Sequence, residues 1–546
     1  MQAPAPSRLS RARVTAAAAA GVAVAVVLAL LVATAPPLGL ALATAIGGGA
    51  WAHAHPDRLA RPLATVRRLA AGALLALALV AGLAAIAAVA IAAALSPALC
   101  ALLVIVAAIL VLAWRAPVWA LGAALLLVGF EGSVKLLIAL ERRPLGDYRS
   151  LGAAAIDVAL FGAIAGVLYG DRLRTPRALW AQATDAERIV MALLGAWLAL
   201  SVAQIPLGGL VRGIEGFRVF QAYTGVAVAV AIVAARHGSP RRVMRAALGL
   251  GLVVSLYAAF RVVFGVSWVE RDFAVSVSSV TVYGGAVRAI GSFSSSIGMG
   301  SFLTPVAVAG LVGGYLMPRV RVLGWATAGL AIIAIIASYG RSPLFGILTG
   351  LLFALILLVG AGDVSTRRKV VAGLLVVATV GVTFGGLQLT SRGSDKLETR
   401  ARGVLNPSQD ESVQLRWDTW KEQLERVSRR PWGYGIGTVG SASADVRRQL
   451  VTTDNSYLKV LVEQGVEGLV VFLAGLLGAM ALLTQRIARR TDEWRAVGVT
   501  ALAAFAGFLG LCFTGEYVEQ PGKAVAWALL GLAVAAAFRP PREVAA

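Results

Sequence analysis

Residues 343–360 read PLFGILTGLLFALILLVG, a run of apolar and small residues without a single charge. A helix needs about 20 mostly apolar residues to cross the hydrocarbon core of a bilayer. Such runs recur along the 546 residues, of which 58% are hydrophobic and only 14% are charged. Soluble domains are about 45–50% apolar and about 25% charged. The sequence therefore predicts an all-α, polytopic membrane helix bundle.

The apolar runs predict about 16 membrane spans. We place them at residues 15–34, 36–52, 69–95, 98–114, 117–140, 150–169, 189–206, 217–235, 246–266, 296–317, 322–339, 343–360, 370–390, 457–483, 497–515 and 522–538. The first run follows three arginines and ends in Ala33-Thr34-Ala35, a pattern that resembles a signal peptide. Because a cleaved apolar region is usually only about 7–15 residues long, we expect a retained span.

The charges predict the topology. With the amino terminus inside, the inside segments are 1–14, 53–68, 115–116, 170–188, 236–245, 318–321, 361–369, 484–495 and 539–546. They hold 27 of the 50 Lys and Arg but 8 of the 28 Asp and Glu, a net of +19 out of the total +22. Basic cytoplasmic segments facing anionic lipid explain this excess without a nucleic-acid partner. We expect a bacterial plasma (inner) membrane protein with both termini cytoplasmic.

One long segment, about 391–456, is predicted to lie outside. Ser408-Gln409-Asp410-Glu411 fits a capping box at a helix start. Apolar residues then recur at helical spacing, as Val413, Trp417, Trp420, Leu424 and Val427. They predict an amphipathic helix to about Arg430, either lying on the membrane or bundle surface or acting as a lid over a lipid-linked substrate.

Pro431 ends this helix, and Trp432-Gly433-Tyr434-Gly435-Ile436-Gly437 follows. Alternating glycines permit tight turns and a close approach of backbone amides to an anionic group. No strand precedes the segment, so it is not a dinucleotide-binding fingerprint.

Charged residues inside spans are costly and are usually paired or functional. Glu131 and Lys135 lie four residues apart and are expected to neutralise each other. The remaining intramembrane charges need partners that the spacing does not identify; they are Asp157, Arg261, Glu463 and Glu467.

Three arginines at outer span ends run against the positive-inside pattern. They are Arg218, Arg288 and Arg341. Each is expected either to extend to the membrane surface or form a local ion pair, or to bind phosphate through two parallel guanidinium hydrogen bonds.

These pieces, in their order, resemble the O-antigen ligase family, which includes lipopolysaccharide O-antigen ligases and related polymerases of O-antigen, exopolysaccharide and teichuronic acid type. The resemblance runs from about 322 to 475. It rests on Tyr339-Gly340-Arg341-Ser342, Leu415-Arg416-Trp417, the 431–437 segment, Asp454-Asn455-Ser456-Tyr457-Leu458 and Glu463-Gln464-Gly465-Val466-Glu467-Gly468-Leu469, with Arg288-Ala289-Ile290-Gly291-Ser292-Phe293 upstream.

The resemblance implies a membrane glycosyltransferase. It would join a glycan from an undecaprenyl-diphosphate-type lipid donor to a glycan or lipid acceptor at the outer face. The expected catalytic residues are Asp454, Arg341 and Arg218, and the expected substrate-binding residues are Arg288, Arg416 and Tyr457. No metal or cofactor is implied.

Asp454 stands where the ligases carry a histidine proposed as catalytic, which favours a polymerase over a lipopolysaccharide ligase. A carboxylate can serve as the base for the acceptor hydroxyl. Asp454 or Asn455 is equally expected to cap the next helix. Glu516 and Glu519, in the last outer turn, are the alternative bases.

Two other functions stay open: a polysaccharide or lipid transporter or flippase, and a non-catalytic component of an envelope-assembly complex. The predicted organisation is a cytoplasmic segment (1–14), an N-terminal transmembrane bundle (15–321), a ligase-like core (322–475), C-terminal transmembrane helices (476–538) and a cytoplasmic tail (539–546).

Overall fold

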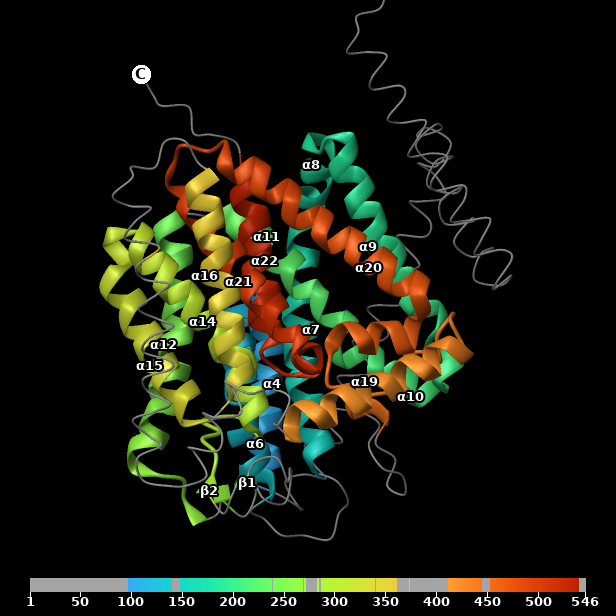
Figure 1. The fold of residues 1–546 in the computed structure, drawn as a ribbon. Helices are drawn as coiled ribbons and strands as arrows, with labels where there is room; N and C mark the ends of the chain where they lie inside the picture. The colour runs from blue at the N-terminus through green and yellow to red at the C-terminus, as the bar shows by residue number, and fades with distance from the viewer. Residues whose placement is uncertain are drawn as a thin grey trace, which may run out of the picture.

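The computed structural model describes residues 97–139, 148–237, 239–268, 270–271, 282–283, 286–338, 340–360, 373, 411–443 and 452–539. These residues form a bundle of helices (Figure 1). The long helices are α4 (Pro97–Arg115), α5 (Pro117–Gly129), α6 (Glu131–Ala139), α7 (Tyr148–Asp171), α9 (Asp185–Ala203), α11 (Thr224–His237), α12 (Pro240–Phe264), α14 (Ser296–Leu316), α15 (Arg321–Ala337), α16 (Arg341–Gly360), α20 (Ser456–Ala488), α21 (Glu493–Phe513) and α22 (Lys523–Phe538).

Shorter elements connect them. They are the α-helices α8 (Arg174–Gln182), α10 (Leu210–Val219) and α19 (Glu411–Arg429), and the 3-10 turns η1 (Ile205–Gly208), η2 (Gln221–Tyr223), η4 (Pro318–Val320), η6 (Ser441–Ser443) and η7 (Tyr517–Glu519). A small antiparallel hairpin of β1 (Val282–Tyr283) and β2 (Ala286–Val287) departs from the all-α prediction.

Every predicted span that lies within the described residues coincides with one of these helices, except 117–140, which corresponds to α5 and α6 together. By length and composition, nine helices of the described residues can cross a membrane, or up to ten if α5 and α6, bent by 68° at their break, form one span. The segments 15–34, 36–52, 69–95 and 370–390 lie outside the described residues. The total of about 16 spans therefore stays a prediction.

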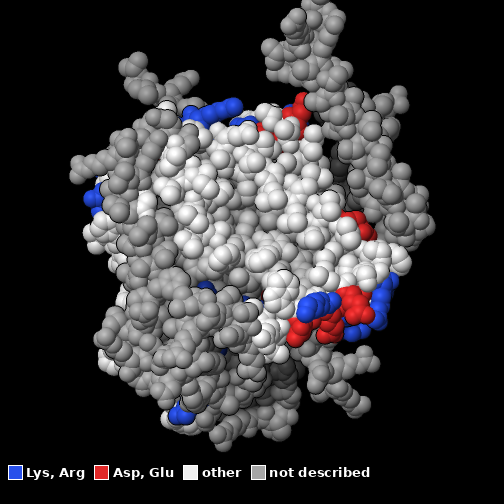
Figure 2. All heavy atoms as spheres, in the orientation of Figure 1, with Lys and Arg blue, Asp and Glu red and all other residues white. Residues whose placement is uncertain are grey.

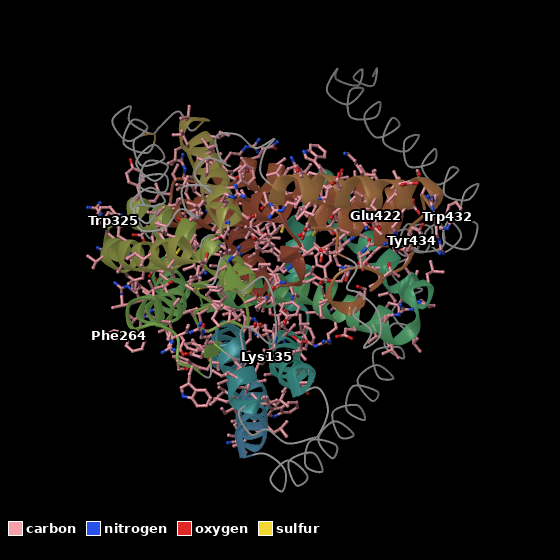
Figure 3. All side chains as sticks on the ribbon, turned by 60° about the horizontal axis from the view of Figure 1, so that its bottom comes forward. Lys135, Phe264, Trp325, Glu422, Trp432 and Tyr434 are labelled. Carbon is pink, nitrogen blue, oxygen red and sulfur yellow. The ribbon has the colours of Figure 1, made fainter. Side chains whose placement is uncertain are left out.

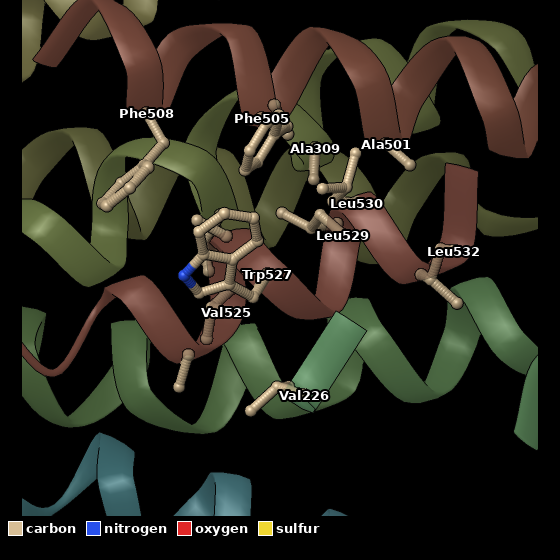
Figure 4. Packing of buried hydrophobic residues seen from close by; sticks show 14 of the residues in the cluster. Val226, Ala309, Ala501, Phe505, Phe508, Val525, Trp527, Leu529, Leu530 and Leu532 are labelled. Carbon is tan, nitrogen blue, oxygen red and sulfur yellow. The ribbon is translucent and has the colours of Figure 1, made fainter. Parts of the chain in front are cut away.

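The centre of the bundle is α14, whose span is 89% buried. It packs against α15, α16 and α21. Small residues let these helices approach closely, as is common inside membranes. A Cβ on Gly350 of α16 would lie 2.7 Å from the carbonyl oxygen of Ala503 in α21. Beside this contact, Phe505 of α21 packs on Trp527 of α22, with Val226 of α11 next to them (Figure 4).

The two ends of the bundle differ in the segments that they collect. Segments predicted to lie inside meet at one end, where Arg241 pairs with Glu493 and Arg490 donates to the carbonyl of Arg539 at 2.6 Å. Figure 1 places α8 at this end, and α19 and the β1–β2 hairpin at the other. Between them the visible surface is mostly uncharged (Figure 2). We call the end with α19 the loop end; which end faces the cytoplasm stays a prediction.

Candidate functional site

The two residues before α20 have different roles. Asn455 is the N-cap, since its side-chain oxygen accepts the backbone N–H of Tyr457 (2.9 Å) and of Leu458 (3.1 Å). Asp454 makes no such bond and has a φ of +46°, a left-handed conformation that few residues with side chains adopt. Its half-buried carboxylate accepts the hydroxyl of Thr452 at 3.3 Å. Capping the helix is therefore the task of Asn455, and the carboxylate of Asp454 remains available for chemistry.

Hydrogen bonds fasten the start of α20 to the turn between α21 and α22. The Ser456 hydroxyl donates to the carbonyl of Gly515 at 2.7 Å. The Glu516 carboxylate accepts both the backbone N–H of Thr453 and its hydroxyl, the latter at 2.6 Å. These contacts join segments about 60 residues apart in the chain and fix where Asp454 lies.

Asp454 and Glu516 share one hydroxyl group. Thr452 Oγ1 lies 3.3 Å from Asp454 Oδ1 and 3.3 Å from Glu516 Oε1. A threonine hydroxyl carries one proton, so it donates to only one of them at a time. Burial, and then the negative charge of Glu519, raises the pKa of Glu516 to about 7 against the opposing charge of Lys459. The site thus pairs two carboxylates in different environments, an arrangement that can divide proton transfer between them.

A fully buried lysine lies behind this turn. Lys459 Nζ is 2.7 Å from each of the Val439 carbonyl oxygen, Glu463 Oε1 and Glu519 Oε1. All three ammonium protons therefore have an acceptor. Burial alone would raise the pKa of Glu519, but Lys459 outweighs burial and holds it below the usual range. Sequence analysis missed this lysine, although its four-residue spacing to Glu463 was the available signal.

The glycine segment 433–437 is held by close backbone contact. Gly437 has a φ of +81°, and a Cβ there would lie 2.1 Å from the carbonyl oxygen of Arg212. Its N–H donates to Glu463 Oε1 at 2.9 Å. Within the described residues, the anionic group that this amide meets is thus a carboxylate of the protein itself.

The hydroxyl of Tyr517 in η7 is influenced by several of the predicted site residues. Its hydroxyl interacts with the hydroxyl of Ser342, the residue after Arg341 at the start of α16. Burial raises the pKa of Tyr517 to about 12; Ser342 and the charge of Arg416 oppose the rise, and the charge of Asp454 adds to it. Both charges therefore lie close enough to act on the phenol. Ser342, which interacts with the Tyr517 hydroxyl, directly follows Arg341 in the chain.

The Arg288 segment reaches the same end of α15 and α16. The backbone N–H of Ala289 donates to the carbonyl of Ala337 at 3.4 Å, shortly before Arg341 in the chain. Arg288 is half-buried, as is Arg341. Two predicted phosphate ligands thus come from neighbouring segments.

Arg218 and Tyr457 are already engaged by protein groups. Arg218 pairs with Asp157 and, at 3.3 Å, with Glu215, which identifies the partner that Asp157 was expected to need. The Tyr457 hydroxyl donates to the carbonyl of Leu509 at 2.8 Å, inside the bundle. Their predicted roles in catalysis and substrate binding stay predictions.

The helix α19 packs over the site, and the face that it buries against the bundle is narrower than predicted. Val427 and Gln423 are buried, whereas Trp417 is 56% exposed and Leu424 is 51% exposed. Trp420 packs its ring against Phe513 with the ring centroids 5.8 Å apart. Burial of this face in the membrane surface, the other predicted environment, stays a prediction; within the described part of the chain, Trp417 and Leu424 do not face the bundle. The reason is that α19 meets only a small apolar cluster: Val427, Val439, Leu458 and Val462.

Tyr434 joins α19 to the glycine segment. Its hydroxyl donates to the carbonyl of Arg426 at 3.0 Å, and the Arg426 guanidinium lies 5.1 Å from its ring centre. Figure 3 shows Glu422 of α19 with Trp432 and Tyr434 on one side of the molecule. The helix and the segment after it therefore dock as one unit. Among the described residues, no group of three or more His, Cys, Asp or Glu is placed to hold a metal ion.

Comparisons with known proteins agree with this geometry. The family model described as O-antigen ligase matches residues 326–473. The match includes Arg341, Arg416, Asp454 and Tyr457, and it leaves Arg218 and Arg288 outside. No curated protein matches the chain. With its apolar helices, the chain is a multi-pass membrane protein, and its residues 326–473 are similar to the O-antigen ligase family.

Proposed function

We propose that the chain is a membrane glycosyltransferase of the O-antigen ligase or polymerase type. It would transfer a glycan from an undecaprenyl-diphosphate-type lipid to a glycan or lipid acceptor at the outer face of a bacterial plasma membrane. The observation that carries this proposal is the pairing of two carboxylates, those of Asp454 and Glu516, on the Thr452 hydroxyl between α20 and the turn after α21. The helices α19 and α16, which carry Arg416 and Arg341, pack against α20 and α21. The family match over residues 326–473, which include Asp454, Arg416 and Arg341, also supports it.

The arginines suit the diphosphate of the donor. Diphosphate concentrates negative charge, and a guanidinium binds its oxygens with two parallel, charge-assisted hydrogen bonds. Arg341 and Arg416 come from α16 and α19, and Arg288 comes from a neighbouring segment. We place these three ahead of Arg218, because two carboxylates already neutralise the Arg218 guanidinium.

Asp454 is the proposed base. As the acceptor oxygen attacks the anomeric carbon, its proton passes to the Asp454 carboxylate. The bond between that carbon and the diphosphate oxygen breaks, and the lipid diphosphate leaves with the electron pair. The arginines stabilise the charge that develops on the leaving group. The site needs no other reactant.

The test is transfer by the purified chain in liposomes that contain an undecaprenyl-diphosphate-linked oligosaccharide. A base of this kind contributes about 10²–10⁴-fold, so Asp454→Asn should lower the rate by that factor. The matched control is Asp418→Asn, because Asp418 lies on α19 with its side chain 73% exposed. A ladder of products indicates a polymerase, and a single transfer to another acceptor indicates a ligase. Near-normal transfer by Asp454→Asn would move the base to Glu516.

Arg341 offers a second test of the same site. Arg341→Lys keeps the charge but loses the paired hydrogen bonds of the guanidinium, so it should be impaired less than Arg341→Ala. A wild-type rate for Arg341→Lys with a low rate for Arg341→Ala would show that Arg341 acts only as a charge, and wild-type rates for both variants would remove Arg341 from the site. Transport of the intact lipid without glycan transfer would instead favour a flippase.

A further inference from the structure

A basic cleft lies at the opposite end of the bundle from the proposed site. It has a volume of about 490 Å³ and opens between α8, α11 and α22. Its polar lining includes Arg174, Arg236 and Arg539, and no Asp or Glu is among the lining residues. Asp171, which directly follows the lining residue Gly170, has a fully buried side chain that pairs with Arg236. The cleft therefore presents an excess of positive charge.

Apart from Thr175 and Gln182, the other side chains that line the cleft are apolar. Leu179 of α8, Ala231 of α11 and Phe538 of α22 line it beside the arginines. Soluble anions gain nothing from such walls, whereas a phospholipid presents a phosphate and an apolar glycerol and acyl region side by side. Basic pockets between membrane helices are typical headgroup sites. This end also collects segments that the charge pattern predicts to face anionic cytoplasmic lipid.

The position of α8 is built into the fold. Arg172 and Leu173, between α7 and α8, both have positive φ, of 50° and 57°, which is uncommon for residues with a side chain. Asp171 holds the turn by accepting the backbone N–H and the hydroxyl of Thr175, each at 2.7 Å. Strained backbone of this kind persists where the surroundings fix it, and it is frequent at ligand sites.

We propose that this cleft binds the headgroup of an anionic phospholipid. Arg174 is the residue most available for it. Its side chain is exposed and, among the described residues, makes no hydrogen bond or ion pair. Arg236 and Arg539, by contrast, also donate to the carbonyls of Gly170 and Ala234. The inference does not depend on the proposed glycosyltransferase activity.

Native mass spectrometry of the purified full chain tests the proposal, with dioleoyl phosphatidylglycerol and dioleoyl phosphatidylcholine titrated separately. The wild-type chain should retain phosphatidylglycerol preferentially. Arg174→Gln should weaken that binding about fivefold, the factor expected for one basic side chain at a lipid surface. Ala178→Phe, which fills the cleft from the exposed side of α8, should weaken it while all the charges remain.

The matched control is Arg177→Gln, because Arg177 is exposed on the same helix but does not line the cleft. If Arg177→Gln weakened phosphatidylglycerol binding as much as Arg174→Gln, the proposal would be overturned in favour of non-specific electrostatic attraction between basic side chains and the lipid. Displacement of the lipid by millimolar inorganic phosphate would overturn it in favour of a soluble anion. Unchanged binding in both Arg174→Gln and Ala178→Phe would also overturn it, whatever the stability of either variant.

Discussion

Replacing Lys459 with methionine tests how strongly the buried ion cluster holds the loop end together. The side chain is 1% exposed, and its ammonium contacts one carbonyl and two carboxylates at 2.7 Å. Lys459→Met keeps an unbranched apolar side chain, one heavy atom shorter, but leaves Glu463 and Glu519 buried without their cation. Breaking a buried pair in this way costs about 3–5 kcal/mol. The unfolding equilibrium should therefore shift by about 10²–10⁴-fold.

The measurement is reversible unfolding of the purified chain by SDS in mixed micelles, followed by circular dichroism. Lys421→Met is the matched control, because Lys421 is 74% exposed and lies 3.4 Å from Asp418. An exposed pair of this kind contributes about 0–1 kcal/mol.

A compensating variant separates lost charge from lost packing. Combining Lys459→Met with Glu463→Gln and Glu519→Gln removes the buried negative charges, so it should recover part of the lost stability. The reasoning fails if Lys459→Met loses no more than Lys421→Met, or if the triple variant is less stable than Lys459→Met.

Three further predictions follow from the same contacts. Because the pKa of Glu516 is raised from 4.5 to about 7, this carboxyl binds more protons in the folded chain, and its contribution to stability falls as the pH rises through that window. The free energy of unfolding of Glu516→Gln, relative to that of the wild type, should therefore rise by about 3 kcal/mol between pH 4.5 and pH 7.5. A difference between the two free energies that stays constant over this pH range would contradict the prediction. Gly437→Ala should destabilise the chain by at least about 1–2 kcal/mol, because it places a Cβ on a residue in the left-handed conformation and against the backbone of Arg212. Gly195→Ala, whose Cβ would have open space around it, should not destabilise the chain, and thermal unfolding of the two variants makes the comparison. A cysteine at the exposed Glu422 should react with a membrane-impermeant thiol reagent in intact cells, and labelling only after permeabilisation would reverse the predicted orientation.

Long apolar runs made the helices of the bundle predictable. A run such as 343–360 has few alternatives to a membrane helix, because every backbone group must be bonded within the bilayer. The face that α19 turns toward the bundle was less predictable. The pattern of Trp417 and Leu424 indicates an apolar environment for this face, but it does not distinguish the bundle from the membrane surface.

The candidate site could also be predicted from the sequence only in part. Arginines at outer span ends and the Asp454-Asn455 pair could be singled out because their positions are unusual for a membrane protein. Their partners could not, because pairs such as Lys459 with Glu519 and Thr453 with Glu516 are about 60 residues apart. Even the choice of helix cap between Asp454 and Asn455 depends on the φ of a single residue, which the sequence does not determine.

The geometry also couples docking of the loop segment to the proposed chemistry. Arg416 lies on α19, whereas Asp454 directly precedes the N-cap of α20, so their relative position depends on the docking of α19 and the glycine segment. That docking depends on Glu463, which accepts the N–H of Gly437 and the ammonium of Lys459. Loss of Lys459 should then lower glycan transfer even where the chain remains folded, because the arginine and the base no longer hold a common position. Lys459 is thus a positioning residue, and it touches neither the donor nor the acceptor in the reaction that we propose.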